Sequence, residues 1–596
     1  MMNIEQIAID DLVLKRKSLR RQLSAAEGLQ PVRIAILGGS TTNELADLLE
    51  LFLLASGFQP VFHQSEYGRY YEDAVLDPSD LIEFAPTIVY VHTSCLNVQT
   101  VPPVHCSDHE FQEHVDAEVG RYRQIWESIE RNLSAQIVQN NFELPPFAVL
   151  GNLDAVSNGG ASRFFLALNA EFARAAAGNP RLLLQDVHGI SARIGLNRWF
   201  DWDRYFGYKI LMTTEGNCAL ARSLASMVRA IYGKSRKVLV LDLDNTLWGG
   251  VIGDDGVDKI QIGRETPVAE AYTAFQEYCL SLYKRGILLA VCSKNNEEIA
   301  KQGFEHPDSV LKLEHISCFK ANWEPKHENI LAIARELNLG ADSFVFVDDN
   351  PAERAIVEAQ IPGIAVPNVG NEVTRYATII EEGRYFEPVS MSAEDLSRTA
   401  LYKSNTERTN LEAKFANYGE YLDSLEMSAE IGRFKSLYLE RIAQLTNKSN
   451  QFNLTTRRYT LAELESIMQD NRYIGLYGKL SDRFGDNGLI SIVLGRREND
   501  VLHLDLWLMS CRVLKRDVEL AMLDVLVENA KAANIGTLRG YYLPTKKNGM
   551  VADHYDKLGF QSETAGPDNN ASVWSLDIST YTPRTQHIRI LEPVHG

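Results

Sequence analysis

The sequence predicts a multidomain α/β protein. It has 596 residues, which is enough for three or four domains of about 100–200 residues each. Along roughly the first 390 residues, apolar stretches that end in polar residues alternate with helix-like stretches, a pattern typical of doubly wound parallel sheets. After about Lys435 the pattern changes to strands separated by Gly/Asp turns, which indicates antiparallel pairing.

The N-terminal part is expected to contain a helical lead-in, residues 1–30, and a first α/β domain, residues 31–233. VRIAILGGSTTNELADLLELFLLASG combines an apolar strand, a glycine-rich turn and a helix whose apolar residues recur with a period near 3.6. TIVYVHTS and PFAVLGNLD repeat the pattern of a strand followed by polar residues. Loops at the carboxyl ends of parallel strands carry the function of such sheets, so these polar residues are candidate site positions.

A second α/β domain is expected at residues 234–390. Its four strand ends are KVLVLDLDNT, GILLAVCSKNN, CFKANWEPK and SFVFVDDNPAE. A polar helical connector, residues 391–434, leads to a domain at residues 435–596. There YIGLYGKLSDRFGDNGLISIVLGRREND and VLHLDLWLMS predict antiparallel strands, KRDVELAMLDVLVENAKAA predicts a long helix, and NGMVADHYDKLGF a closing helix and strand.

Composition excludes several classes of function. A net charge of −19 disfavours nucleic acid and anionic membranes as partners, because both would repel such a surface. Neither a signal peptide nor an apolar membrane-spanning run is visible. The cysteines lack the spacing of a zinc site or a disulfide framework, which predicts a cytoplasmic protein with reduced thiols. They are Cys95, Cys106, Cys218, Cys279, Cys292, Cys318 and Cys511.

The stretch VLVLDLDNTLWGG, residues 238–250, places Asp242 and Asp244 at the end of an apolar strand. A carboxylate there is costly unless its charge is compensated. Side chains two residues apart on an extended backbone point the same way, so the two carboxylates repel each other. A divalent cation with oxygen ligands, typically Mg²⁺, would relieve that repulsion.

The other strand ends of this domain carry complementary groups. Asp348 and Asp349 form a second acidic pair that can complete the shell of a cation. Ser293 ends LLAVCS, and Lys326 lies in NWEPKHENI. A hydroxyl and an ammonium group are suited to hold a phosphoryl oxygen. The order along the chain is therefore acid pair, hydroxyl, lysine and acid pair.

This set resembles the haloacid-dehalogenase-like (HAD) phosphohydrolase superfamily, whose motif DxDxT stands here as Asp242-Leu-Asp244-Asn-Thr246. The resemblance implies a Rossmann-like central domain. It implies that Asp242 is the nucleophile that forms an aspartyl-phosphate and that Asp244 protonates the leaving oxygen and later activates water. The implied phosphate-binding residues are Thr246, Ser293 and Lys326. The implied ligands of Mg²⁺ are Asp242, the main-chain carbonyl of Asp244, Asp348 and Asp349.

The region between Asp244 and Ser293 is too short for a large lid domain. It spans about fifty residues, much of it the helix-like VAEAYTAFQEYCLSLYKRG. WGGVIGDDG is expected to form the glycine-containing hairpin that follows the first motif in such folds. A site without its own lid suits a substrate that is carried on a protein or covered by a neighbouring domain.

More specific sequence motifs extend the resemblance to the FkbH-like family, over roughly residues 30–585. These motifs are LDLDNTLWGGVIGDDG, CSKNN, ANWEPK, FVFVDDNPAER, LTNKSNQFNLTTRRY, FGDNGLISIV and LMSCRVLKRDVE. That family couples an HAD domain to a GNAT-like acyltransferase domain. The resemblance implies that the glyceryl unit of 1,3-bisphosphoglycerate is dephosphorylated and delivered to an acyl carrier protein, in polyketide or similar biosynthesis.

In the C-terminal domain, GNAT-type enzymes bind the pyrophosphate of coenzyme A with the loop that precedes the long helix. The usual glycines of that loop are replaced here by RVLKRD, which favours the phosphopantetheine of a carrier protein. We expect Arg512, Lys515 and Arg516 to bind its phosphate. Cys511 is the candidate carrier of the acyl group as a thioester, with Cys292 as the alternative.

The N-terminal domain weakly resembles the SGNH hydrolases, which implies an SGNH-like doubly wound fold. The matching blocks are LGGST with Ser40, GNLD with Gly151, Asn152 and Asp154, and DVHG with Asp186 and His188. The first block has GGS instead of GDS, and Asp186 and His188 are one residue too close. A degenerate domain that docks the carrier is therefore the alternative to an ester-cleaving site. His92 is interpreted as structural, and His554 as a surface histidine that, with Tyr555, is a candidate proton donor.

Two other functions remain open at this point. The first is a stand-alone Mg²⁺-dependent phosphatase acting on a small phosphorylated metabolite. The second is a scaffold that binds carrier proteins through an inactive HAD domain. The sequence does not choose the carrier, the acyl group or the oligomeric state.

Overall fold

The structure is a computed structural model that describes residues 4, 7–391, 393–396, 398–412, 414–448, 452–510, 513–545, 548–563 and 571–591. It divides into two compact units. Unit 1 is Met1–Arg229 with Thr460–Ser466, and unit 2 is Ala230–Tyr459 with Ile467–Gly596. The expected division into five parts remains a prediction. Among the described residues no helix combines the length and apolar character needed to cross a membrane.

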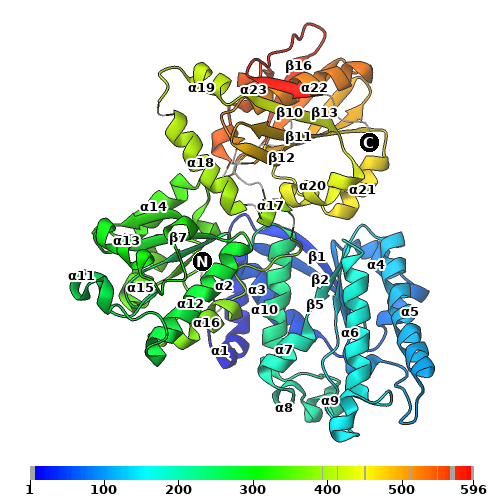
Figure 1. Ribbon diagram of the computed structural model, residues 1–596. Coiled ribbons are helices and arrows are strands. Elements are labelled where there is room, and N and C mark those ends of the chain that lie inside the picture. Colours follow the sequence, from blue (N-terminus) through cyan, green and yellow to red (C-terminus); the bar gives the residue numbers. More distant parts are fainter. Residues whose placement is uncertain are drawn as a thin grey trace. The chain divides into compact units, whose positions relative to one another are not determined.

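Unit 1 contains a parallel five-stranded sheet in the order β2-β1-β3-β4-β5. The expected doubly wound α/β pattern is confirmed: α3 lies on one face of the sheet, and α5 and α6 lie on the other (Figure 1). The strands are β1 (Gln30–Gly38), β2 (Phe58–Gln64), β3 (Ile88–His92), β4 (Gln136–Asn140) and β5 (Leu182–Gln185). The helices are α1 (Ile9–Leu14), α2 (Arg16–Ser24), α3 (Asn43–Ala55), α4 (Ser79–Phe84), α5 (Asp108–Asn132), α6 (Ala161–Ala177), α7 (Val187–Ile194), α8 (Leu196–Trp199), α9 (Trp202–Tyr208) and α10 (Thr214–Ile231), whose last residues belong to unit 2.

One expected strand of this unit is wrong. PFAVLGNLD forms no strand, and its second half, Gly151–Ala155, is a short 3-10 helix. The strand is instead β4, in the preceding stretch QIVQN. Phe147 and Val149 are 67% and 85% exposed, so their apolar character is not explained by burial in a sheet. Two prolines directly before Phe147 also remove backbone donors that a sheet would need.

The central part of unit 2 is a parallel four-stranded sheet in the order β8-β7-β6-β9. Side chains of β6 alternate between two apolar clusters, with Leu239 and Leu241 on the α12 face and Val238 and Val240 on the α14 face. The strands are β6 (Val238–Leu241), β7 (Leu288–Ser293), β8 (Ile316–Ala321) and β9 (Phe344–Val347). The helices are α11 (Ile252–Asp255), α12 (Pro267–Lys284), α13 (Glu297–Glu305), α14 (Lys326–Glu336), α15 (Pro351–Gln360) and α16 (Tyr376–Glu382).

The segment after the first acid pair differs from the expected hairpin. WGGVIGDDG turns into the short helix α11, and an antiparallel bridge between Gly249 and Gln261 closes the loop. Asp244 provides the reason, because its carboxylate accepts the N–H of Ile252 at 3.1 Å and so holds the first residue of α11.

The C-terminal part of unit 2 is an eight-stranded sheet, β15-β16-β14-β13-β12-β11-β10-β17. The expected antiparallel pairing of β11, β12 and β13 is confirmed. The strands are β10 (Met427–Arg433), β11 (Tyr473–Asp482), β12 (Gly485–Glu498), β13 (Val501–Met509), β14 (Thr537–Tyr542), β15 (Gln561–Glu563), β16 (Ser572–Asp577) and β17 (Ile588–Leu591). The helices, connector included, are α17 (Ala393–Leu396), α18 (Arg398–Glu412), α19 (Tyr418–Ser424), α20 (Ser436–Lys448), α21 (Leu461–Gln469, shared with unit 1), α22 (Val518–Ala532) and α23 (His554–Lys557).

Strands β13 and β14 are parallel, joined through α22, and separate after the pair Leu504–Gly540. Residues 452–455 lie between these two strands. Leu454 donates its N–H to the carbonyl of Trp507 at 3.1 Å and accepts the N–H of Leu543 at 2.9 Å. The gap between the two strands is thus bridged by backbone hydrogen bonds on both sides.

Candidate active site

The central sheet of unit 2 brings the four predicted strand ends to one edge. Its strands are parallel, so their carboxyl ends meet. Asp242 follows β6, Ser293 ends β7, and Asp348 follows β9 directly. Lys326 is the first residue of α14, reached by a short loop from β8.

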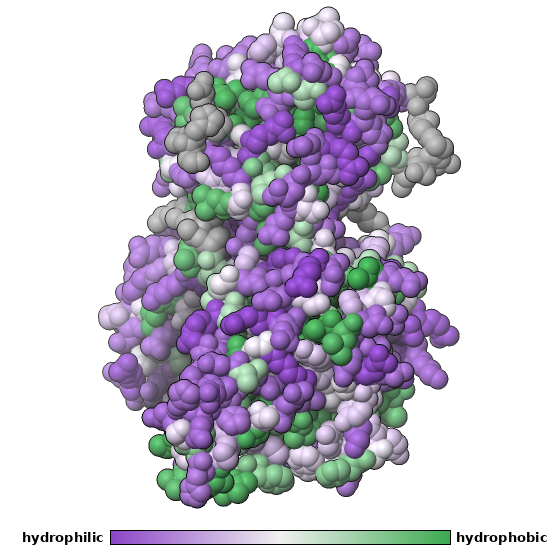
Figure 2. Space-filling model, turned by 90° about the vertical axis from the view of Figure 1, so that its right-hand side faces the viewer, coloured by the Kyte–Doolittle hydropathy of each residue, from purple (hydrophilic) through white to green (hydrophobic). Residues whose placement is uncertain are grey.

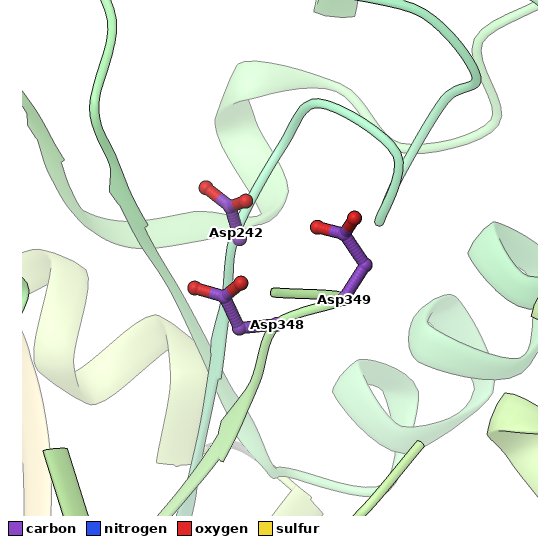
Figure 3. Close-up of side chains that lie close together, drawn as sticks. All are labelled: Asp242, Asp348 and Asp349. Atoms are coloured by element: carbon purple, nitrogen blue, oxygen red, sulfur yellow. The ribbon is translucent and has the colours of Figure 1, made fainter. Parts of the chain in front are cut away.

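Lys326 joins the two acidic strand ends. Its ammonium Nζ lies 2.9 Å from Oδ1 of Asp242 and 2.5 Å from Oδ2 of Asp348. The side chains of all three are at least nine-tenths buried. Figure 3 shows the carboxylates of Asp242, Asp348 and Asp349 turned toward a common space, and one oxygen of each lies within 4.8 Å of the others.

Burial and mutual repulsion shift the acidities of this group. Burial, followed by the charge of Asp242, raises the pKa of Asp348 to about 6. The same two causes, burial first, raise the pKa of Asp349. Burial alone would lower the pKa of Lys326, but the charges of Asp242 and Asp348 outweigh it and raise that pKa. The ammonium is therefore firmly protonated and offsets one of three negative charges.

The residues fit a hard divalent cation. One lysine leaves two negative charges of the three carboxylates uncompensated. Oδ1 of Asp242 is buried beside the Lys326 ammonium, which Asp348 also engages. Carboxylates this close together, with one ammonium between them, repel each other unless a cation joins them. Carboxylate oxygens are the ligands that Mg²⁺ and Ca²⁺ prefer.

Asp244 stands apart from the three-carboxylate group. Oδ1 of its carboxylate accepts the indole N–H of Trp248 at 3.0 Å, and Oδ2 accepts the amide of Asn295 at 3.0 Å. Burial is the largest cause of its raised pKa, and repulsion from Asp242 adds to it. Asp244 is thus fixed in orientation and more readily protonated than a free aspartate, which suits a proton donor.

The two predicted phosphate-binding hydroxyls differ. Thr246 is fully buried, and its Oγ1 accepts the backbone N–H of Asp349 at 3.3 Å, so it ties the first strand end to the last. Ser293 is 2% exposed, and no described residue forms a hydrogen bond with its hydroxyl. The Ser293 hydroxyl is therefore free to bind a phosphoryl oxygen, whereas Thr246 already serves a structural contact.

Two residues that sequence reasoning missed hold the site together. Asn295 bonds Asp244, as above. Arg354, mostly buried, donates from one guanidinium nitrogen to the carbonyls of Asp348 and Asp349, both at 2.7 Å, and from the other to Asn368 at 2.9 Å. An arginine five and six residues after an acid pair, inside DDNPAER, was the available signal. It was not recognised because backbone carbonyls leave no trace in sequence.

The predicted carrier-binding and thioester residues have different outcomes. Cys511 and Arg512 lie outside the described residues. Lys515 is exposed. Arg516 is buried, donates to Asp482 at 3.0 Å and to Asn405 at 3.2 Å, and so is engaged inside the protein. Cys292 is fully buried with its thiol against the carbonyl of Lys326, and burial raises its pKa well above that of a free thiol.

In unit 1 the predicted SGNH-like residues have separate hydrogen-bond partners. Among the described residues, Ser40 Oγ has one hydrogen-bond partner, His92 Nε2 at 3.2 Å. Asp186 caps α7 by accepting the N–H of Gly189 at 3.0 Å. His188 donates its backbone N–H to Asn141.

The GNLD block has a structural explanation. Asn152 is exposed on the 3-10 helix Gly151–Ala155. Asp154 is buried and accepts the N–H of Ser162 at 2.7 Å. It therefore satisfies a free donor in the first turn of α6.

The interpretation of His554 as a surface residue is wrong. The side chain is buried, packed edge-on against Trp507 at 4.8 Å between ring centres and against Phe452 at 5.0 Å. Burial lowers its pKa to about 3. The helix α23 has only four residues, so its apolar neighbours, not its own periodicity, decide which side chains are covered.

One solved structure that contains a phosphatase domain is similar to this chain. No protein-family model and no curated protein matches the chain. The N-terminal part of the protein BF1531 from Bacteroides fragilis, a crystal structure containing a phosphatase domain complexed with Mg, is 32% identical, with a TM-score of 0.58, over 63% of this chain and 99% of that one. The chain belongs to the family of this phosphatase-domain protein.

Two acetyltransferase structures also match, over about a quarter of the chain. The ribosomal-protein-S18-alanine N-acetyltransferase from Escherichia coli is 16% identical over 26% of this chain and 99% of that one, with a TM-score of 0.21. Ard1 from Thermoplasma volcanium is 14% identical over 25% and 97%, with a TM-score of 0.20.

Proposed function

We propose that this chain is an FkbH-like enzyme in which an HAD-type, Mg²⁺-dependent phosphatase works with a GNAT-like acyltransferase domain. It takes a phosphoglyceryl unit from 1,3-bisphosphoglycerate, removes the phosphate through an aspartyl-phosphate and loads glyceryl on an acyl carrier protein. The observation that carries the phosphatase part is the group of Asp242, Asp348 and Asp349, whose buried or half-buried carboxylates share one space beside the Lys326 ammonium. The carrier and the glyceryl unit rest on the sequence resemblance.

Asp242 begins the phosphatase reaction. Its carboxylate oxygen forms a bond to phosphorus while the bond from phosphorus to the leaving oxygen breaks. Asp244, whose raised pKa favours the protonated form, gives its proton to that oxygen. Asp244 then takes a proton from water, which attacks the phosphorus, releases phosphate and restores Asp242.

Three groups stabilise the charge of the transferring phosphoryl group. The Lys326 ammonium and the free hydroxyl of Ser293 are held at the same sheet edge as Asp242. Asp242, Asp348 and Asp349 hold Mg²⁺, in agreement with the Mg complex of the related phosphatase-domain structure. When bound, Mg²⁺ neutralises negative charge on the carboxylates and on the phosphoryl oxygens.

An exposed aromatic residue supports a substrate carried on a partner. Trp323 is 76% exposed and precedes Lys326 by three residues. A large apolar side chain is costly in water and is enriched where partners bind. We assign Trp323 to contact with the carrier-bound substrate.

The C-terminal domain supplies the acyl transfer. Lys515 and Asp517, in the loop before α22, both have positive φ, 63° and 59°, although neither is glycine. Left-handed residues before a helix N-terminus can turn backbone N–H groups toward an anion. Lys515, with Arg512, meets the phosphate of phosphopantetheine, whereas Arg516 contributes from within by bracing the loop through Asp482.

Cys511 carries the acyl group in this proposal, because the buried, weakly acidic thiol of Cys292 is poorly suited to do so. Intact-mass measurement of Cys511→Ser and Cys292→Ser after incubation with 1,3-bisphosphoglycerate decides between them. The adduct should vanish in Cys511→Ser and persist in Cys292→Ser.

One experiment tests the whole function. The enzyme, Mg²⁺, 1,3-bisphosphoglycerate and a phosphopantetheinylated carrier protein are mixed, and every protein is weighed. A glyceryl mass on the carrier supports the proposal. Phosphate release without a mass shift would leave a stand-alone phosphatase, and neither outcome would leave a carrier-binding scaffold.

A further inference from the structure

A second group of reactive side chains lies at the carboxyl edge of the sheet in unit 1. From β1 the chain passes through α3 to β2 on one side, whereas from β3 it passes through α5 to β4 on the other. Sheets of this strand order bind ligands outside the carboxyl ends of the strands where the direction reverses, here between β1 and β3. Ser40 follows β1 by two residues, and His92 ends β3.

Ser40 and His92 form a buried pair. The Ser40 hydroxyl lies 3.2 Å from Nε2 of His92, and the two residues are 5% and 4% exposed. Burial lowers the pKa of His92 to about 4, so its ring is neutral near pH 7. A neutral imidazole beside a serine hydroxyl has the geometry of a nucleophile and its base.

The other ring nitrogen is oriented by a hydrogen-bonded chain. Tyr90 donates its hydroxyl proton to Oδ1 of Asn140 at 2.7 Å, and the Tyr90 oxygen lies 3.1 Å from Nδ1 of His92. The Asn140 amide nitrogen donates to the carbonyl of Thr93 at 3.1 Å and also lies 3.2 Å from Nδ1 of His92. In the tautomer with the proton on Nδ1, that proton is donated to the Tyr90 oxygen and the Nε2 lone pair faces Ser40.

The backbone around Ser40 offers donors to a developing negative charge. Among the described residues, none accepts a hydrogen bond from the Ser40 backbone N–H. The 13-residue helix α3 begins three residues later, with its N-terminus toward this edge. A Cβ on Gly39 would lie 2.3 Å from the Asn97 amide, so the turn that presents Ser40 requires glycine there.

We propose that Ser40 is the nucleophile of a second active site, specific for carboxylic esters or thioesters, with His92 as its base. Ser40 Oγ bonds to the carbonyl carbon, and its proton passes to Nε2 of His92. The bond to the leaving alkoxide or thiolate breaks, and His92 protonates that group. Water then attacks the acyl-serine, His92 again transfers the proton, and a carboxylic acid and Ser40 are released. This proposal does not depend on the phosphatase.

An apolar surface on α9, the helix that Thr41 contacts, indicates the kind of ester. Thr41 binds α9 directly, since its hydroxyl donates to the carbonyl of Tyr208 at 2.8 Å. The neighbouring rings of Phe147, Trp202 and Phe206 are stacked, and Phe147 and Phe206 are 67% and 70% exposed. Figure 2 shows hydrophobic side chains along the lower edge of its view, at the level of α8 and α9 in Figure 1. We assign this surface to the apolar part of the ester.

The test uses the full-length chain and an alkyl fluorophosphonate. This probe bonds to an activated serine oxygen and releases fluoride, and peptide mass mapping locates the adduct. We expect the adduct on Ser40 in the wild type and in Asp242→Asn, and none in Ser40→Ala. In His92→Gln labelling should slow by about 10²-fold or more, as expected for loss of a general base. p-Nitrophenyl hexanoate should be cleaved faster than the acetate, and Phe206→Ala should remove that preference.

Matched variants separate a catalytic from a structural role. His188→Gln should be labelled at the wild-type rate, and Tyr90→Phe, which keeps the ring but not the hydroxyl, about tenfold more slowly. Tyr90→Phe replaces the His92 variant if that one does not fold, as judged by its thermal transition. Absence of an adduct on Ser40 in the wild type, or wild-type labelling rates in both His92→Gln and Tyr90→Phe, would overturn the proposal.

Discussion

The two parallel sheets of this protein place polar groups at the same kind of edge but balance them differently. In unit 2, the carboxylates of Asp242, Asp348 and Asp349 lie close together, and the Lys326 ammonium offsets one of their three negative charges. In unit 1, Ser40 and His92 belong to a neutral chain of hydrogen bonds. The edge in unit 2 needs a bound cation to balance its negative charge, whereas the polar groups at the edge in unit 1 already have hydrogen-bond partners. Charge balance, not fold, therefore separates a metal site from a candidate nucleophile site.

The largest expected effect follows from removing the acid that attacks phosphorus. Asp242→Asn keeps the shape of the side chain but removes the negative charge, so Mg²⁺-dependent phosphate release should fall by about 10⁴-fold or more. Fluorophosphonate labelling of Ser40 should not change. Asp254→Asn, an exposed acid on α11, is the control and should keep full activity. Substantial phosphate release by Asp242→Asn would show that the two edges are not chemically distinct as described.

Metal removal should affect only one of the two edges. A chelator should abolish phosphate release reversibly and leave Ser40 labelling unchanged. Mg²⁺ at about 100 times its Kd should stabilise the wild type by about 2.7 kcal/mol, seen as a rise in Tm. Asp349→Asn, which leaves the Lys326 ion pairs intact, should show a much smaller rise. An equal rise in both proteins would place the cation elsewhere.

Arg354 should have an intermediate effect as a positioning residue. Arg354→Lys cannot serve the carbonyls of Asp348 and Asp349 and Asn368 together, so at least one buried acceptor loses its donor. We expect a loss of about 1–3 kcal/mol in the free energy of unfolding. We also expect about tenfold lower kcat with little change in KM, since a displaced carboxylate weakens transition-state contacts. Arg335→Lys, at an exposed site on α14, is the control. Unchanged kcat and stability would contradict this role.

Trp323 should have the smallest effect. Because it is 76% exposed, Trp323→Ala should change the free energy of unfolding by about 0.5 kcal/mol or less. Phosphate release from p-nitrophenyl phosphate should stay at the wild-type rate. Glyceryl transfer to the carrier protein should fall several-fold through KM. If both substrates lose activity equally, Trp323 acts on the phosphoryl site itself and not on the carrier.

Strand order explains why the central site was predictable. Its acidic and hydroxyl residues follow or end buried apolar runs, Lys326 follows the partly buried β8, and parallel strands necessarily bring such positions to one edge. The residues that brace them were missed. Arg354 acts on backbone carbonyls and Asn295 on Asp244, and neither contact has a characteristic spacing.

In unit 1 the resemblance to the SGNH hydrolases paired Ser40 with Asp186 and His188. The hydrogen bond between Ser40 and His92 was not predicted. The hydrogen bond to His92 arises because β1 and β3 are neighbours, although 52 residues separate Ser40 from His92. The strand predicted in PFAVLGNLD is absent for a related reason. An apolar run beside prolines is compatible with either a strand or an exposed apolar surface.

The sequence by itself determined the alternation of strands and helices, the acidic strand ends and the chemistry that carboxylates, a hydroxyl and a lysine can perform. These depend on local periodicity and side-chain type. Only the tertiary structure decided which histidine meets Ser40, which arginines are buried in ion pairs, and that residues 452–455 lie between β13 and β14. Such contacts join residues far apart in the chain, and burial and hydrogen-bond satisfaction, which select them, are properties of the packed fold.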